Sequence, residues 1–256
     1  MITSAGNTFV KNLTALGQKK RRDETGLFIL EGESFVKAIP PMWEIKHLVL
    51  AERYAKACAE LAPNTIIIAD SLFKKISDAV TPQGVLAVCV QKQATLEDCL
   101  GGGFLLFAEN LADPGNVGAI IRTAAAAGCG GVILSQGSAD AYSPKVLRAS
   151  AGAFFRVPVV EGTDTASVLR VIGQKGYMRV AAHPRGIEDS LYTLDFKQKC
   201  CILIGNESAG LSETALSLCD KTVKIPMAAG VESLNAAVSA GILMYEIVRA
   251  CLKNPI

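Results

Sequence analysis

Short apolar runs alternate with amphipathic segments along the chain, and this alternation is typical of proteins that layer helices on sheets. In the first part of the chain, strands are predicted at LFILEG (27–32), IKHLVLA (45–51), TIIIA (65–69) and GVLAVCV (84–90). Helices are predicted at residues 7–18, 33–39, 53–61 and 71–78. We therefore expect residues 1–97 to form a small α/β domain.

The second part of the chain repeats the alternation with longer helices. Its predicted strands are residues 104–109, 131–135, 156–160, 178–183, 201–207 and 222–226. Its predicted helices are residues 118–127, 144–151, 165–174, 212–218 and 233–252. Apolar strands without an in-and-out alternation are typical of a parallel sheet that is buried on both faces. We therefore expect a second α/β domain, residues 104–256, around a mainly parallel sheet.

Two polar stretches interrupt this pattern. Three consecutive glycines at 101–103 do not suit a helix or strand interior, so a linker is predicted at residues 98–103. The basic cluster KKRR (19–22) lies in a linker-like stretch before the first predicted strand. Four consecutive cations could contact phosphates, or they could form a solvated turn balanced by Asp23 and Glu24. Taken alone, the cluster is better explained as a solvated turn, whereas in a protein that handles RNA we would favour contact with phosphates.

Composition limits the class of protein. The chain has 256 residues, of which 50% are hydrophobic and 20% charged, and its net charge is +2, as expected for a globular protein of two domains. Its eight cysteines include no CxxC pair, so we expect reduced thiols in the core. The apolar stretch near the end contains Glu246 and Arg249, so no membrane span is predicted. With no signal-peptide core at the start, we expect a cytoplasmic location.

The stretch DPGNVGAIIRTAAAAG (113–128) follows a predicted strand and opens a helix, where α/β proteins place ligands. Its glycines do not form GxGxxG, and no GxxxxGK[ST] occurs, which disfavours a dinucleotide or a nucleoside triphosphate. Asp113 and Pro114 are explained as a helix cap and a first helical residue. Asn116 and Arg122 have no such local explanation and are candidates for the site.

Two later loops have the same placement. In LIGNESAGLS (203–212), Gly205 would let a ligand approach the backbone and Glu207 offers a carboxylate, although an ordinary turn with a solvated glutamate explains them equally well. In IPMAAGVESLNAAVSAG (225–241), Ser233 is expected to cap a helix or to present a polar pair with Asn235.

The sequence contains few residues suited to a metal site, a catalytic triad or an aromatic stacking site. The two histidines, His47 and His183, are solitary, so neither a metal site nor a catalytic triad is predicted. Few aromatic residues are present, which disfavours a protein that binds single strands by stacking.

Together, these stretches resemble the three motifs of the SpoU class of TrmH-like RNA ribose 2′-O-methyltransferases, in the SPOUT superfamily. All three occur in the family order, and YSPKVLRASAGAFFRVPV (142–159) also resembles the family. The resemblance covers residues 104–252. The first part, with FILEGESFVKAI (28–39), resembles the N-terminal substrate-binding domain of the family, which is like certain ribosomal proteins.

The resemblance implies a trefoil knot, S-adenosylmethionine (AdoMet) as cofactor and a homodimer. It implies that Gly205, Ile225 and Leu234 hold the cofactor largely through backbone groups. It assigns the catalytic pocket to Asn116, Arg122, Glu207, Ser233 and Asn235. Asn116 and Arg122 would face the ribose and phosphate of the RNA, and no metal is implied. One departure is minor: Ala236 stands where valine is common.

The function implied is methylation of a ribose 2′-hydroxyl, most reasonably in ribosomal RNA and next in transfer RNA. We prefer a positioning and electrostatic role for Arg122, since a guanidinium titrates too high to act easily as a base. The base would then be an RNA phosphate or water. The alternatives are a catalytically inactive RNA-binding protein of the same fold and a nucleotide-dependent oxidoreductase, which the missing GxGxxG disfavours.

Overall fold

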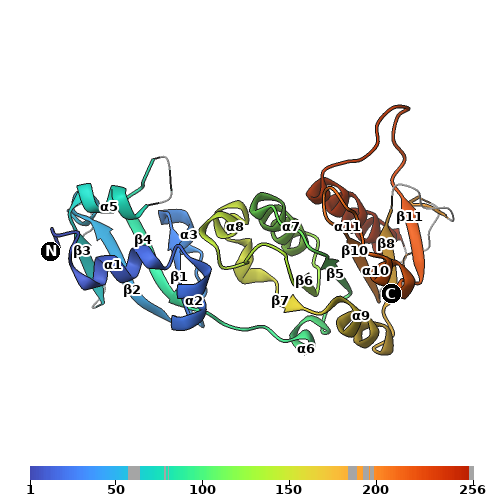
Figure 1. The fold of residues 1–256 in the computed structure, drawn as a ribbon, viewed down its shortest axis with the longest axis horizontal. Helices are drawn as coiled ribbons and strands as arrows, with labels where there is room; N and C mark the ends of the chain where they lie inside the picture. Colours follow the sequence, from blue (N-terminus) through green and yellow to red (C-terminus); the bar gives the residue numbers. More distant parts are fainter. Residues whose placement is uncertain are drawn as a thin grey trace.

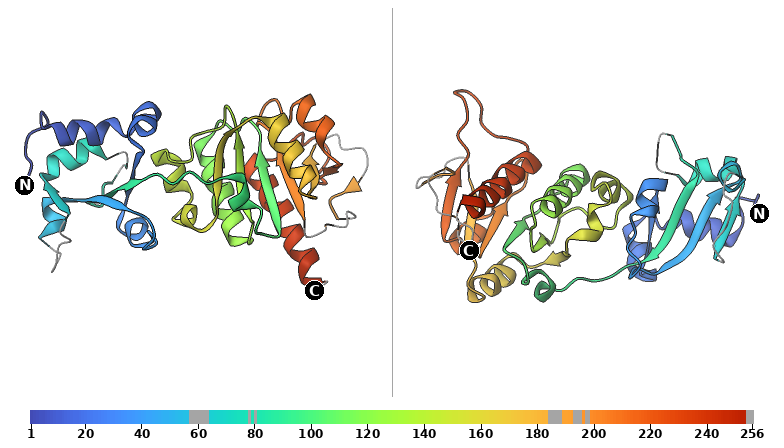
Figure 2. Two further views of the ribbon diagram at one scale, coloured as in Figure 1. Left: turned by 90° about the horizontal axis from the view of Figure 1, so that it is seen from below. Right: turned by 180° about the vertical axis from the view of Figure 1, so that it is seen from behind.

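A computed structural model gives the fold of the chain. It describes residues 1–56, 64–77, 79, 81–183, 189–192, 196 and 199–253. The molecule is elongated, and two α/β domains lie side by side along its long axis (Figure 1). An extended segment leaves the last strand of the first domain and crosses to the second, as both views in Figure 2 show.

The first domain contains a four-stranded sheet in the order β1-β4-β2-β3. β4 is antiparallel to both β1 and β2, whereas β3 is parallel to β2. The strands are β1 (Leu27–Glu31), β2 (Ile45–Ala51), β3 (Thr65–Ile68) and β4 (Val85–Val90). The helices are α1 (Thr8–Ala15), α2 (Lys19–Thr25), α3 (Glu33–Lys37), α4 (Glu52–Ala55) and α5 (Asp70–Ile76). The prediction of a small α/β layer ahead of the parallel sheet is confirmed.

The second domain contains a sheet in the order β7-β6-β5-β10-β8-β11-β9, and every neighbouring pair in it is parallel. Its strands are β5 (Phe104–Ala108), β6 (Gly131–Ser135), β7 (Val159–Thr163), β8 (Met178–Ala182), β9 (Asp189–Ser190), β10 (Cys200–Ile204) and β11 (Lys221–Lys224). Its helices are α6 (Leu96–Cys99), α7 (Pro114–Ala126), α8 (Pro144–Ala149), η1 (Ala153–Arg156, a 3-10 helix), α9 (Thr165–Gln174), α10 (Glu213–Leu218) and α11 (Ala236–Lys253). The predicted parallel sheet is confirmed.

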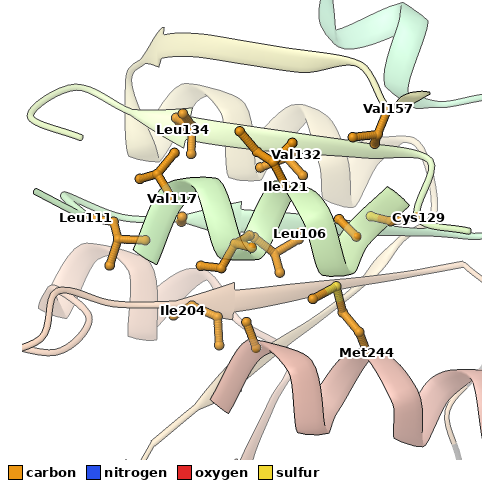
Figure 3. Packing of buried hydrophobic residues seen from close by; sticks show 14 of the residues in the cluster. Leu106, Leu111, Val117, Ile121, Cys129, Val132, Leu134, Val157, Ile204 and Met244 are labelled. Atoms are coloured by element: carbon orange, nitrogen blue, oxygen red, sulfur yellow. The ribbon is translucent and has the colours of Figure 1, made fainter. Parts of the chain in front are cut away.

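Helices cover both faces of this sheet, which explains why its strands β5 and β10 are apolar throughout. Leu106 of β5 packs with residues of α7, α8 and α11, and Figure 3 shows it beneath Val117 and Ile121 of α7. Its neighbours Leu105 and Phe107 belong to a second cluster with residues of α9 and α10. All five residues of β5, β6 and β10 are buried, as expected for strands covered on both sides.

The order of the strands differs from their order along the chain. β10 lies between β5 and β8, and β11 pairs with the other edge of β8. The loops that follow β5 and β10 therefore leave neighbouring strands at the same end of the sheet. The trefoil knot that the resemblance implies stays a prediction.

The two domains share one hydrophobic core and a buried ion pair. Phe28 of β1 packs on Tyr142 with ring centroids 4.9 Å apart, and Trp43 packs on Phe155 at the same separation. The Tyr142 hydroxyl donates to the Lys92 carbonyl and accepts from the Lys92 N–H, which anchors the connecting segment. These contacts attach the first domain firmly to the second.

The basic cluster 19–22 is not a linker but helix α2. Gly26, with φ +63°, ends this helix in the left-handed region. Arg22 is only 2% exposed; its guanidinium pairs with Asp140 of the second domain and donates to the carbonyls of Leu16 and Gly17. Neither earlier interpretation covers Arg22, because its side chain turns inward at a junction that the sequence pattern does not mark.

Several predicted boundaries also need correction. The last helix begins at Ala236 and not at Ser233, because the side chain of Asn235 accepts from the N–H groups of Ala237 and Val238 and caps it. Helix α7 starts at Pro114, four residues earlier than predicted. β9 was not predicted, and β7 begins at Val159 because η1 precedes Pro158. Of the helix predicted at 53–61, residues 57–61 lie outside the described part of the chain.

Candidate active site

The candidate site lies where three strands of the second domain end. β5, β10 and β11 each run into an irregular loop, and these loops lead to α7, α10 and α11. Carboxyl ends of parallel strands are the usual ligand-binding edge of an α/β sheet. The predicted site residues therefore lie on the expected loops or, for Asn116 and Arg122, on the helix α7 that follows the first of them.

Three of these residues form a directed chain of hydrogen bonds. The Asn235 Oδ1 atom accepts from two N–H groups of α11, so its amide nitrogen must point away from that helix. This nitrogen donates to Asn116 Oδ1 over 2.9 Å, and Asn116 Nδ2 donates to Glu207 Oε1 over 2.8 Å. The start of α11 thus sets the orientation of both amides and delivers a donor to the carboxylate. Glu207 Oε2 makes no hydrogen bond with described residues and can accept one from a ligand.

A tight hairpin presents Glu207. Asn206 and Gly210 exchange two backbone hydrogen bonds, of 3.0 and 2.9 Å, and Asn206 Oδ1 accepts from the N–H groups of Ser208 and Ala209. A Cβ at Gly205 would lie 2.2 Å from the carbonyl carbon of Gly210, so only glycine lets the hairpin close there. Gly205 therefore shapes the loop that carries the carboxylate.

Arg122 lies on the exposed side of α7, and its guanidinium makes no hydrogen bond or ion pair with the residues that the structure describes. It is one turn beyond Gly118, where a Cβ would lie 2.4 Å from the Ala149 Cβ of α8. Arg122 is therefore on the side of α7 that is nearer to α8, whereas Asn116 faces the start of α11. The structure does not join Arg122 to the amide chain; it leaves its cation available at the surface of the same helix.

The segment between β11 and α11 carries the remaining predicted residues. Ile225 packs against the core, whereas Ser233 and Leu234 are exposed on a loop that extends away from the sheet (Figure 1). Ser233 and Leu234 make no hydrogen bond with the Asn116–Glu207 pair. Over residues 226–234, Val231 N–H to the Ala228 carbonyl is the one backbone–backbone hydrogen bond with described residues. Most backbone donors and acceptors of this loop therefore have no backbone partner among the described residues.

Sequence reasoning missed Glu109, which ends the predicted strand 104–109. Glu109 is 7% exposed, and its carboxylate accepts from Thr165 Oγ1 and from the N–H and Oγ of Ser212. One feature of the sequence could have identified Glu109: its carboxylate directly follows a fully apolar run. A buried carboxylate requires several donors, so this position indicated a polar contact with another segment.

The site contains no set of metal ligands. Within the described residues, no group of three His, Cys, Asp or Glu side chains could hold a metal ion.

Burial raises the thiol pKa of Cys89, Cys99, Cys129 and Cys200 to about 12, so these cysteines are core residues and not nucleophiles. No helix among the described residues is long and apolar enough to cross a membrane.

A parallel α/β sheet that brings a carboxylate and two amides together at the carboxyl ends of its strands has the arrangement of an α/β protein with a ligand site at that edge. Comparison with known proteins gives the family. The model of the SpoU rRNA Methylase family matches residues 103–245, and that of the MRM3-like substrate binding domain matches residues 7–87. The chain belongs to the SpoU rRNA methylase family.

Relatives of similar length support this assignment. The 23S rRNA (guanosine(2553)-2′-O)-methyltransferase RlmP of Bacillus subtilis is 32% identical over 96% of this chain and 98% of its own. The AdoMet-bound rRNA methyltransferase of Sinorhizobium meliloti has a TM-score of 0.86 at 33% identity, covering 97% of each chain. The AdoMet complex of AviRb from Streptomyces viridochromogenes, a SpoU methyltransferase, has a TM-score of 0.86 at 30% identity, covering 96% and 98%.

Proposed function

We propose that this protein transfers a methyl group from AdoMet to a ribose 2′-hydroxyl of RNA. The observation that carries the proposal is the convergence of Glu207 and Asn235, from two separate loops, on Asn116 of α7, the helix that also bears Arg122. The same residues were predicted from the family motifs, and the relatives named above are 2′-O-methyltransferases or bind AdoMet.

The loops fit AdoMet as cofactor. Its adenine ring can pair with backbone donors and acceptors, and most of these groups in the loop of residues 226–234 have no backbone partner among the described residues. When bound, AdoMet supplies a methyl carbon activated by a sulfonium, so the protein mainly contributes alignment. Gly205, Ile225 and Leu234 remain the residues proposed to hold it. Ser233, beside Leu234 on the same loop, remains proposed to complete the pocket.

Arg122 is proposed to bind the RNA phosphate beside the reacting ribose. A guanidinium binds a phosphate in a bidentate manner and favours negative charge that develops on a nearby oxygen. Because Arg122 has no partner among the described residues, no internal ion pair has to break before it binds a phosphate. Asn116, with its amide orientation set by Asn235, would hydrogen-bond the ribose. The proton of the 2′-hydroxyl passes to an RNA phosphate or to water.

Ribosomal RNA is the proposed substrate, with transfer RNA as the alternative. The first domain matches a substrate-binding domain, and RlmP is named as an enzyme that acts on 23S rRNA. The cytoplasm remains the proposed location, since it is compatible with an RNA substrate. Mapping ribose methylation in cells that lack the protein tests this choice: we expect one lost 2′-O-methyl group in ribosomal RNA. A loss confined to transfer RNA would favour the alternative, and no loss would favour an inactive RNA-binding protein.

A homodimer is also part of the proposal, and α11 supplies its surface. Val238, Tyr245 and Leu252 are spaced seven residues apart and are 51%, 51% and 76% exposed, so they form an apolar stripe along this helix. Ala119 and Ala126 lie on the neighbouring helix α7, where small side chains allow close approach of a partner helix. A second copy of this chain would cover both surfaces.

We expect Tyr245→Glu to convert the dimer to a monomer. A carboxylate at the centre of the apolar stripe would be desolvated without a partner, which weakens dimerisation by about a hundredfold or more. Light scattering after size-exclusion chromatography measures the mass. The control is Met42→Glu, since Met42 is 69% exposed on the first domain. Equal masses for wild type and Tyr245→Glu would contradict this part of the proposal.

A further inference from the structure

Glu109 is a buried carboxylate that the proposed reaction does not use. It lies at the carboxyl end of β5 and is 7% exposed. Its Oε1 atom accepts from Thr165 Oγ1 over 2.9 Å and from Ser212 Oγ over 2.8 Å. Its Oε2 atom accepts from the Ser212 N–H over 2.7 Å. All its partners are neutral, so the side chain is held by hydrogen-bond geometry and not by an ion pair.

These bonds close the loop of residues 205–211. The Glu109 N–H donates to the Ile204 carbonyl over 2.8 Å, immediately before the loop, and the Glu109 carboxylate binds Ser212, immediately after it. One residue therefore holds both ends of the loop. The bond from Asn206 Nδ2 to the Asn110 carbonyl, 2.8 Å long, adds a third attachment.

The backbone turn at Asn110, next to Glu109, also helps to attach the loop. Asn110 has φ +50°, in the left-handed region that few residues other than glycine adopt. This turn directs the Asn110 carbonyl toward Asn206 immediately after the strand ends. The Asn110 N–H donates to Ser135 Oγ over 2.8 Å, which stabilises the turn.

We propose that Glu109 is a positioning residue that holds the loop 205–211 in the conformation that binds AdoMet. The inference rests on the proposed function, because this loop carries Gly205 and Glu207. Both Glu109 oxygens are occupied by Thr165 and Ser212, so we assign the carboxylate no direct contact with AdoMet or RNA. Releasing Ser212 would free one end of the loop, and Gly205 and Glu207 would then shift relative to α7.

The geometry makes different substitutions behave differently. Glutamine has the same length: its oxygen can accept from the Ser212 N–H, and its amide can donate to the two hydroxyls, which can turn to accept. Aspartate is one methylene shorter and cannot reach both Thr165 and Ser212. Alanine leaves the buried N–H and both hydroxyls without an acceptor. Binding should therefore follow the length of the side chain and not its charge.

Calorimetric titration of AdoMet into the full chain tests the proposal. We expect Glu109→Ala and Glu109→Asp to weaken the Kd by about tenfold or more, and Glu109→Gln to stay within about threefold of wild type. Asp164→Ala is the matched control. It removes the cap of α9 one residue from Thr165, where Asp164 accepts from Ser167, without touching the loop. This control should lower Tm yet leave the Kd unchanged.

Amide hydrogen exchange without AdoMet gives a second readout. Residues 205–211 should exchange faster in Glu109→Ala and Glu109→Asp than in wild type, and at the wild-type rate in Asp164→Ala. An unchanged Kd in Glu109→Ala would overturn the proposal, as would an order in which aspartate binds well and glutamine does not. Failure of wild type itself to bind AdoMet would instead contradict the proposed function, and unchanged exchange in Glu109→Ala would still overturn the role of Glu109.

Discussion

Arg122→Ala is expected to lower the rate of methyl transfer by about a thousandfold, while the Kd for AdoMet stays within about twofold of wild type. Removing a single preorganised group that stabilises a developing oxyanion costs a factor on the order of a hundred to a thousand, and Arg122 also positions the phosphate. Cofactor affinity should persist because Arg122 forms no hydrogen bond or ion pair with the loops after β10 and β11 in the described structure. Single-turnover kinetics and calorimetry measure the two quantities.

The matched control for this prediction is Arg170→Ala. Arg170 is also an exposed arginine of the second domain, but α9 carries it on the opposite face of the sheet. We expect this variant to keep the wild-type rate within about twofold, since its charge lies away from the loops. Equal rate losses in both variants would show that Arg122 acts only through general attraction to RNA. A parallel loss of AdoMet binding in Arg122→Ala would show that its role has been misassigned.

Arg22→Ala is expected to destabilise the protein by about 3–5 kcal/mol, because it leaves the Asp140 carboxylate largely buried without its cation. The side chains of Arg22 and Asp140 are 3% and 10% exposed. The variant also leaves the Leu16 and Gly17 carbonyls without their donor. Because these contacts join the domains, the two domains should unfold in separate calorimetric transitions. Denaturant unfolding measures the loss of free energy.

The neighbouring arginine supplies the control for Arg22. Arg21 pairs with Glu24 at the surface, where its side chain is 39% exposed, and such pairs contribute at most about 1 kcal/mol. Arg21→Ala should therefore leave one unfolding transition and nearly the wild-type stability. Similar small effects for both variants would contradict the conclusion that the junction between the domains depends on the buried pair.

The fold was predictable where burial dictates composition. β5, β6 and β10 are covered on both faces, so all their positions except Ser135 at the end of β6 are apolar, and this pattern is typical of a parallel sheet. The junction of the domains was not predictable, because a buried arginine in a run of four cations has the same sequence signal as an exposed one. The start of α11 was ambiguous because Ser233 and Asn235 are both good helix caps. In the structure Asn235 accepts from two N–H groups of α11 and also contacts Asn116, a residue that is distant in the sequence.

The candidate site was predictable as a set of loops but not as a network. Glu207 and Asn235 lie 91 and 119 residues from Asn116 along the chain, and only the arrangement of strands brings them together. Family motifs supplied the residue types without the direction of the hydrogen bonds. Glu109 was missed because its partners, Thr165 and Ser212, look like ordinary helix starts in the sequence. Which side chains hydrogen-bond one another depends on contacts between distant segments, and local sequence patterns do not reveal these contacts.

The most direct test is to incubate the purified protein with ribosomal RNA and AdoMet labelled in its methyl group, and then to identify the labelled nucleoside by mass spectrometry. The proposed function predicts label on a single nucleoside, at its ribose 2′-oxygen, and labelling about a thousandfold slower with Arg122→Ala. Label on a base, or no transfer to any RNA by a protein that binds AdoMet, would contradict it.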